Sequence, residues 1–138
     1  MPAARFVDTN VLLYTVSTDP READKRLVAG ELLANPHLAL SAQVLHEFYA
    51  RATRGGRAGA LSHAQARALV VSFLRYPVQD LTSSIVLAAT ETAERYRISY
   101  WDAAILEAAR VMGCREVLSE DLSHGQDYGG VLVTNPFV

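Results

Sequence analysis

The sequence lacks several features that would indicate an extracellular or membrane protein. It contains a single cysteine, Cys114, so no internal disulfide can form, and a buried thiol in a reducing compartment is expected. No apolar run reaches the roughly 20 residues that a membrane-spanning helix needs. Residues 1–5 lead directly into a predicted strand without the apolar region of a signal peptide. We therefore expect a cytoplasmic protein that makes no contact with a membrane.

Sequence motifs of several common enzyme classes are also missing. There is no repeat, no low-complexity tract, no glycine-rich phosphate-binding loop and no dinucleotide-binding fingerprint. A response-regulator receiver domain needs a lysine late in the chain, but Lys25 is the only lysine. A haloacid-dehalogenase-like phosphatase needs a second aspartate two residues after the first, where this chain has Asn10. These classes are therefore excluded.

The charge balance leaves the choice of substrate open. The formal net charge is −2, which argues against nucleic-acid binding by bulk electrostatics. Every basic residue other than Lys25 is an arginine, however, and the planar guanidinium group suits bidentate contacts with phosphate. The charge therefore neither supports nor excludes RNA or DNA.

Alternating strand and helix patterns predict one α/β domain over residues 1–138 with a central, mostly parallel sheet. Two helix starts are well marked: Asp19 precedes a proline, and Ser62 has the capping-box spacing to Gln65. Strands are expected over residues 4–7, 38–40, 78–81, 117–119 and 131–133. Helices are expected over residues 9–14, 19–33, 41–53, 62–75, 84–97 and 100–112.

Four acidic residues lie near the predicted ends of strands or the starts of helices: Asp8, Glu47, Asp102 and Asp121. Ligands bind at the carboxyl ends of the strands in open α/β sheets. Carboxylates that converge there repel one another unless a divalent cation neutralises them. The pattern therefore predicts a metal site, and most naturally one for phosphodiester chemistry.

Each of these acids also has a structural interpretation. Asp8 is suited to cap the helix that follows it, and Glu47 is spaced to form an i,i+4 pair with Arg51. Asp102 stands three residues after Ser99, as in a capping box. These interpretations are compatible with a site at the edge of the sheet, because helix starts lie there.

Asp121 lies in a polar, glycine-rich segment that could be a simple turn. Glu120 and Asp127 compete with it for any metal role. His124 is expected to be the only histidine near the acids, and to be solvated. The remaining acids on helices are expected on solvated faces: Glu22, Glu31, Glu91, Glu94 and Glu107.

The motifs together resemble the PIN-domain nucleases, in particular the VapC-type toxins of bacterial type II toxin–antitoxin pairs. The resemblance rests on residues 7–12 (VDTNVL), Glu47 within an amphipathic helix, residues 99–105 (SYWDAAI) and residues 119–121 (SED). Residues 120–126, with Asn135-Pro136-Phe137 near the end of the chain, resemble one branch of that family closely. The resemblance covers essentially the whole chain.

This resemblance implies a three-layer α/β/α fold and an endoribonuclease that hydrolyses RNA with Mg²⁺ or Mn²⁺. It implies that Asp8, Glu47, Asp102 and Asp121 are the catalytic and metal-binding quartet. Asp8 and Asp102 are the candidates for direct ligands, and Glu47 and Asp121 would act through water or a second ion. Secondary polar contributions are expected from Thr9, Asn10, Ser119 and Glu120. The implied partners are an RNA substrate, a cognate antitoxin protein and a second copy of the chain.

Two further groups of residues suggest contacts with RNA. Arg51, Arg54 and Arg57 surround a glycine-rich segment and form either a phosphate clamp or a solvated loop. Tyr100 and Trp101 suit stacking on a base, although partial burial of at least one is expected. The alternative function is a catalytically silent PIN-fold module that binds RNA or protein, against which the intact acidic quartet argues.

Overall fold

The computed structural model describes residues 4–138, and its centre is one five-stranded sheet. The strand order is β3-β2-β1-β4-β5, and all four pairings are parallel, as the sequence predicted. The strands are β1 (Arg5–Val7), β2 (Leu38–Ser41), β3 (Val78–Gln79), β4 (Glu116–Leu118) and β5 (Leu132–Thr134). The helices are α1 (Thr9–Tyr14), α2 (Ala23–Leu33), α3 (Ala42–Ala52), α4 (His63–Phe73), α5 (Ser83–Tyr96) and α6 (Tyr100–Val111).

Most helices begin where the capping residues predicted. Ser62 and Gln65 form the reciprocal capping box of α4, and Ser41 Oγ accepts a hydrogen bond from Val44 N at the start of α3. The start at Asp19 is different, because Pro20–Glu22 forms a 3₁₀ turn (η1) and the α-helix begins only at Ala23. The third strand is shorter than predicted and ends at Gln79.

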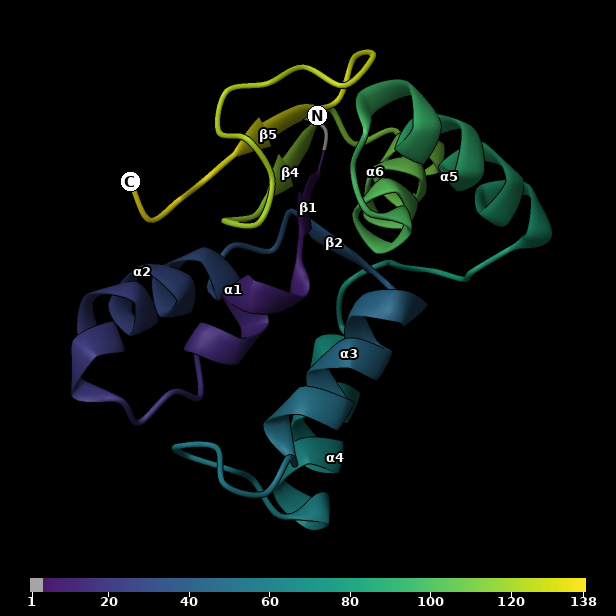
Figure 1. Cartoon of the computed structure of the whole chain (residues 1–138). Coiled ribbons are helices and arrows are strands. Elements are labelled where there is room, and N and C mark those ends of the chain that lie inside the picture. Colours follow the sequence, from purple (N-terminus) through teal and green to yellow (C-terminus); the bar gives the residue numbers. More distant parts are fainter. Residues whose placement is uncertain (1–3) are drawn as a thin grey trace.

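The layers follow from the direction in which the chain crosses the sheet. The α5 and α6 pair covers one face, and α1 to α4 lie toward the other (Figure 1). Helix α6 is buried along seven consecutive residues, Ala103 to Ala109, because it lies between the sheet and α5. The three-layer α/β/α architecture implied by the sequence is therefore confirmed.

The strand order reverses beside β1, because the chain crosses back after β3 and adds β4 on the other side of β1, and this reversal positions the functional site. From β1 the sheet extends through β2 to β3 on one side and through β4 to β5 on the other. The boundary between β1 and β4 is thus a topological switch point, where open α/β sheets bind ligands at the carboxyl ends of the strands. The hydrogen bond from Asp8 N to Leu118 O, 3.0 Å long, continues the β1–β4 pairing to this edge.

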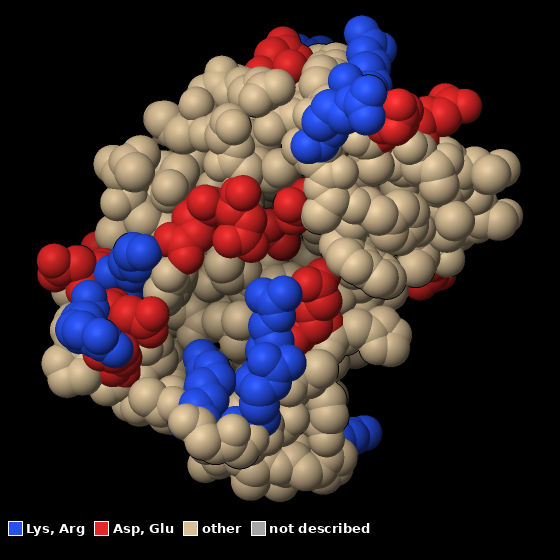
Figure 2. All heavy atoms as spheres, in the orientation of Figure 1, with Lys and Arg blue, Asp and Glu red and all other residues tan. Residues whose placement is uncertain are grey.

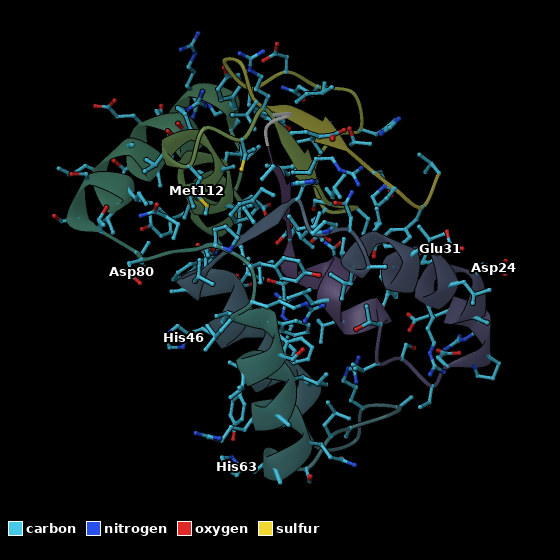
Figure 3. The ribbon with its side chains drawn as sticks, turned by 180° about the vertical axis from the view of Figure 1, so that it is seen from behind. Asp24, Glu31, His46, His63, Asp80 and Met112 are labelled. Atoms are coloured by element: carbon cyan, nitrogen blue, oxygen red, sulfur yellow. The ribbon has the colours of Figure 1, made fainter. Side chains whose placement is uncertain are left out.

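The structure separates the helical acids into two kinds. Glu31 points outward from α2, as expected, and Asp24 on the same helix does so too (Figure 3). The prediction for Glu107 was wrong, because this residue is only 6% exposed. Its carboxylate forms an ion pair with Arg110, with 3.1 Å between Nε and Oε1, which makes burial on the inner side of α6 possible.

Cys114 is a buried free thiol, as predicted. Among residues 4–138, no helix is both long and apolar enough to cross a bilayer.

Candidate metal centre

Three of the four predicted acids meet at the switch point. Asp8 follows β1, Asp121 follows β4, and Asp102 lies in the first turn of α6. One carboxylate oxygen from each residue lies within 4.8 Å of the other two. Three segments that are far apart in the sequence therefore place hard oxygen donors around one point.

Asp8 is the buried member of this group, with 4% of its surface exposed. Its Oδ1 accepts a hydrogen bond from Thr9 N (2.7 Å), so the predicted helix cap is present as well. Burial raises the pKa of Asp8 to about 7, and the charges of Asp121 and Glu47 act in the same direction against the hydrogen bonds from Ser119 and Thr9. A nearby cation would relieve this destabilisation of the charged form.

Two of the predicted secondary residues hold the acids in place. Ser119 Oγ donates to Asp8 Oδ2 (2.7 Å) and accepts a hydrogen bond from Asp121 N (3.0 Å). Asn10 Nδ2 contacts Ser119 Oγ at 3.1 Å and Asp121 Oδ2 at 3.2 Å. The polar residues that follow β1 and β4 thus join Asp8 and Asp121 into one network.

Asp102 has both of its predicted features. Ser99 Oγ accepts a hydrogen bond from Asp102 N (3.1 Å), as expected for a helix cap. The carboxylate itself faces the other acids, and partial burial, together with the charge of Asp121, raises its pKa. The hydrogen bond with Ser99 and the charge of Arg51 oppose this rise. The Ser99 cap at the start of α6 therefore helps to place the Asp102 carboxylate beside the other two acids.

Glu47 lies beside the three-acid group but outside it. Its Oε2 is 3.3 Å from Arg51 Nη2, so the predicted i,i+4 pair is present, and its Oε1 accepts a hydrogen bond from Gln43 Nε2 (3.0 Å). Glu47 nevertheless lines the same cavity as Asp8 and Asp102. It therefore lies at one side of the three-acid group.

Glu120 and Asp121 are adjacent in the sequence but have different contacts in the structure. Glu120 accepts hydrogen bonds from the Tyr14 hydroxyl and from Lys25, whose Nζ is 2.9 Å from Glu120 Oε2. Lys25 Nζ also lies 4.9 Å from the centroid of the Tyr14 ring. Glu120 is thus held in an ion pair with the sole lysine, and Asp121 is the member of the three-acid group.

The expectation for the histidines was wrong in part. His124 is exposed as predicted, and its Nδ1 accepts a hydrogen bond from Asn135 N (2.9 Å). His46, which projects outward from α3 (Figure 3), lines the cavity of the acids and was not anticipated. Asp127 accepts a hydrogen bond from Gly130 N in its own turn and takes no part in the acidic group.

The donor set fits a hard divalent cation. The acids line a cavity of about 510 Å³, which opens within a band of acidic side chains across one face of the molecule (Figure 2). Thr9 also lines this cavity, and its Oγ1 is buried with no hydrogen-bond partner among the described residues. Carboxylate and hydroxyl oxygens are the ligands that Mg²⁺ and Mn²⁺ prefer.

The three predicted arginines divide into two kinds. Arg51 and Arg57 line a second cavity of about 380 Å³ next to the acids, and Asp121 lines both cavities. Arg57 also donates hydrogen bonds to the carbonyl oxygens of Ala58 and Leu13. Arg54 is exposed and lines neither cavity.

Some cavity residues were missed at the level of sequence. Gln43 precedes Glu47 by four residues, so helical spacing alone could have placed it beside Glu47. Leu81 lies in the segment between β3 and α5, and no local pattern marked it.

An open parallel sheet that gathers acidic side chains at its switch point belongs to the class of α/β proteins that bind ligands at the carboxyl ends of their strands. The chain belongs to the PIN domain family, which it matches over residues 5–125. The resemblance seen in the motifs is therefore confirmed at the level of the family. The chain has no significant sequence match among curated proteins.

Several solved structures share the fold. VapC20 from Mycobacterium tuberculosis, described as a sarcin–ricin loop cleaving toxin, is 24% identical with a TM-score of 0.67, covering 86% of this chain and 92% of that one. A toxin–antitoxin complex from Klebsiella pneumoniae is 20% identical with a TM-score of 0.68, covering 97% and 98%. A DNA-bound VapBC from Salmonella typhimurium is 20% identical with a TM-score of 0.66, covering 98% and 99%.

Proposed function

We propose that this protein is a metal-dependent endoribonuclease that acts as the toxin of a toxin–antitoxin pair. The observation that carries the proposal is the convergence of Asp8, Asp102 and Asp121 at the switch point of a PIN-family sheet. The shared fold of VapC20, a toxin that cleaves the sarcin–ricin loop, supports RNA as the substrate.

In this proposal Asp8 and Asp102 hold Mg²⁺ or Mn²⁺ directly, and Asp121 and Glu47 complete the acidic quartet. The bound ion supplies charge neutralisation and Lewis-acid polarisation of the scissile phosphate. Hydrolysis forms a bond from the water oxygen to phosphorus and breaks one phosphodiester P–O bond, with no covalent intermediate on the protein. The proton that the water loses is balanced by the proton that the departing ribose oxygen takes up from solvent, so that this oxygen leaves as a hydroxyl group. The carboxylates of Glu47 and Asp121 orient the attacking water.

The surrounding residues of the chain bind and position the substrate. Ser119 and Asn10 fix the carboxylates of Asp8 and Asp121 through the network described above. Arg51 lines both cavities at the acidic site, so its guanidinium group is available to a phosphate of the bound strand. Arg57 is a second candidate for such a contact.

The proposed partners follow from the structural neighbours. The Klebsiella and Salmonella structures are toxin–antitoxin complexes of the same fold, which supports a cognate antitoxin for this chain. We propose in addition that the protein acts as a homodimer, and that it works in the cytoplasm, where cellular RNA is found.

Incubation of the purified protein with total cellular RNA, with and without Mg²⁺ or Mn²⁺, tests the proposal. Sequencing of new RNA ends should show discrete cuts that require both the ion and Asp8. Asp8→Asn should abolish these cuts, and Asp24→Asn, the same change at an outward-pointing position on α2, should not. Absence of cuts by folded protein that binds the ion would favour the alternative, a silent RNA- or protein-binding module.

A further inference from the structure

Trp101 is an exposed aromatic residue directly beside the acidic site. Its side chain is 63% exposed, whereas large aromatic residues are highly buried on average. It immediately precedes Asp102 at the start of α6. A large apolar ring that remains in solvent one residue away from a candidate metal ligand requires a functional explanation.

The local structure holds Trp101 firmly in this position. Its ring packs edge to face against Tyr100, with 5.1 Å between centroids and an interplanar angle of 78°, and Tyr100 is itself partly buried against the core. Its carbonyl oxygen accepts a hydrogen bond from Gln43 Nε2 (3.1 Å), and the same nitrogen contacts Glu47. The exposed ring is therefore presented by an ordered backbone that is tied to the acidic site.

One cavity joins Trp101 to the acids. Asp8, Asp102 and Asp121 line the cavity of about 510 Å³, and Trp101 and Leu81 contribute apolar side chains to it. Its volume lies in the range of about 300–1,000 Å³ that is typical of small-molecule sites. A strand whose phosphate lies at the acids therefore shares this cavity with the side chains of Trp101 and Leu81.

We propose that Trp101 is a stacking platform for an unpaired nucleobase adjacent to the phosphodiester that is cleaved. This inference rests on the proposed function and adds a substrate-contacting residue to it. Every base has a face that can stack on an aromatic ring, so the contact selects for unpaired structure more than for sequence. A base inside a duplex is covered on both faces by its neighbours and cannot make the contact.

The single tryptophan makes this proposal directly measurable, since Trp101 is the only source of tryptophan fluorescence in the chain. We would titrate the Asp8→Asn protein, in the presence of Mg²⁺, with oligo(A), with oligo(U) and with the duplex of the two. Stacking predicts quenching by either single strand and little change with the duplex. Equal quenching by the duplex, or none by the single strands, would overturn the proposal.

Cleavage kinetics on the RNA fragment that carries the main cut provide a second test. Trp101→Ala should raise KM by about 10- to 100-fold with a much smaller change in kcat, since loss of one stacked base weakens binding by about that factor. Trp101→Phe keeps an aromatic face and should recover most of the loss. Leu87→Ala is the control, because Leu87 is 69% exposed on α5 and lies outside the cavity.

The outcomes separate the inference from the proposed function. Unchanged kinetics in Trp101→Ala, with intact metal-dependent cleavage, would remove the stacking platform and leave the nuclease. A fluorescence change that follows protein concentration and ignores RNA would show that another protein surface covers Trp101, which also overturns the inference. If the wild type cuts no RNA at all, the proposed function fails, and the oligonucleotide titration still decides whether Trp101 stacks on bases.

Discussion

Ser119 Oγ donates a hydrogen bond of 2.7 Å to Oδ2 of Asp8, and this contact joins the ends of β4 and β1 across 111 positions of sequence. It is one of few groups that stabilise the charged form of Asp8, because the side chain is buried and faces Asp121 and Glu47. The result is a carboxyl group with a pKa of about 7 at the point where a cation is proposed to bind.

The raised pKa of Asp8 predicts a specific pH dependence of stability without metal. The folded state binds this proton more tightly than the unfolded chain, so the stabilising contribution is complete below about pH 4 and is lost as the pH rises through about 7. Asp8→Asn removes this titration. Urea unfolding in EDTA should therefore show that the mutant gains about 1–4 kcal/mol relative to wild type between about pH 4 and about pH 8.

Asp24→Asn is the control for this measurement, because it makes the same chemical change at an exposed position on α2. If the curves of the wild type and Asp8→Asn run parallel over that range, Asp8 does not carry a raised pKa and the electrostatic description of the site is wrong.

The contrast between Glu120 and Asp121 gives a second prediction. Asp121→Asn weakens the oxygen donor set, whereas Glu120→Gln disturbs the contacts of Glu120 with Tyr14 and Lys25 outside that set. The partly exposed ion pair with Lys25 contributes at most about 1 kcal/mol to stability. Near pH 8, Mg²⁺ at about 100 times its Kd should stabilise wild type by about 2.7 kcal/mol. Thermal unfolding should show this gain retained in Glu120→Gln and strongly reduced in Asp121→Asn. The reverse order would assign the metal role to Glu120.

Much of the fold was predictable because its determinants are local. Capping at Ser41, Ser62 and Ser99 depends on residues within one helical turn, and the structure contains all three caps. The parallel sheet followed from the alternation of strands and helices. The acids were found because Asp8 and Asp121 each follow an apolar strand, so their approach to one sheet edge required no knowledge of long-range packing.

The remaining features depend on contacts between distant parts of the chain. Glu120 turns toward Lys25, 95 positions away, and no local pattern distinguishes it from Asp121. Glu107 has the spacing of a polar helix face, but α5 covers it, and Thr92 Oγ1 donates a hydrogen bond to its Oε2 (3.0 Å). The exposure of Trp101 likewise depends on which surfaces of α6 its neighbours cover.

Gly59 provides a test of the loop that follows α3. It adopts a left-handed conformation (φ +78°), and an added Cβ would lie 2.9 Å from Thr18 Oγ1 and 3.1 Å from Val16 O. Gly59→Ala should therefore destabilise the protein by about 1–3 kcal/mol. Gly55→Ala is the matched control, since its Cβ would meet no atom within 4 Å. Equal free energies of unfolding for the two variants would show that the loop does not dock against residues 16–18.

Two ion pairs with the same i,i+3 spacing allow a test of how burial changes their contribution to stability. Glu107 pairs with Arg110 on α6, and Arg110 also donates hydrogen bonds to the carbonyl oxygens of Tyr128 (2.8 Å) and Gly129 (2.6 Å). The Glu94–Arg97 pair, 3.5 Å apart, is exposed on both sides.

Glu107→Ala should lower the free energy of unfolding by about 2–3 kcal/mol, because Thr92 and Arg110 lose the buried carboxylate that they share. The loss also weakens the attachment of residues 128–129 to α6, since that carboxylate holds the Arg110 guanidinium group in place. Glu94→Ala should change it by no more than about 0.5 kcal/mol, since water replaces the lost partner. Urea denaturation of both variants in parallel gives the comparison. A loss in Glu107→Ala as small as that in Glu94→Ala would mean that apolar packing alone holds α6 against residues 128–129.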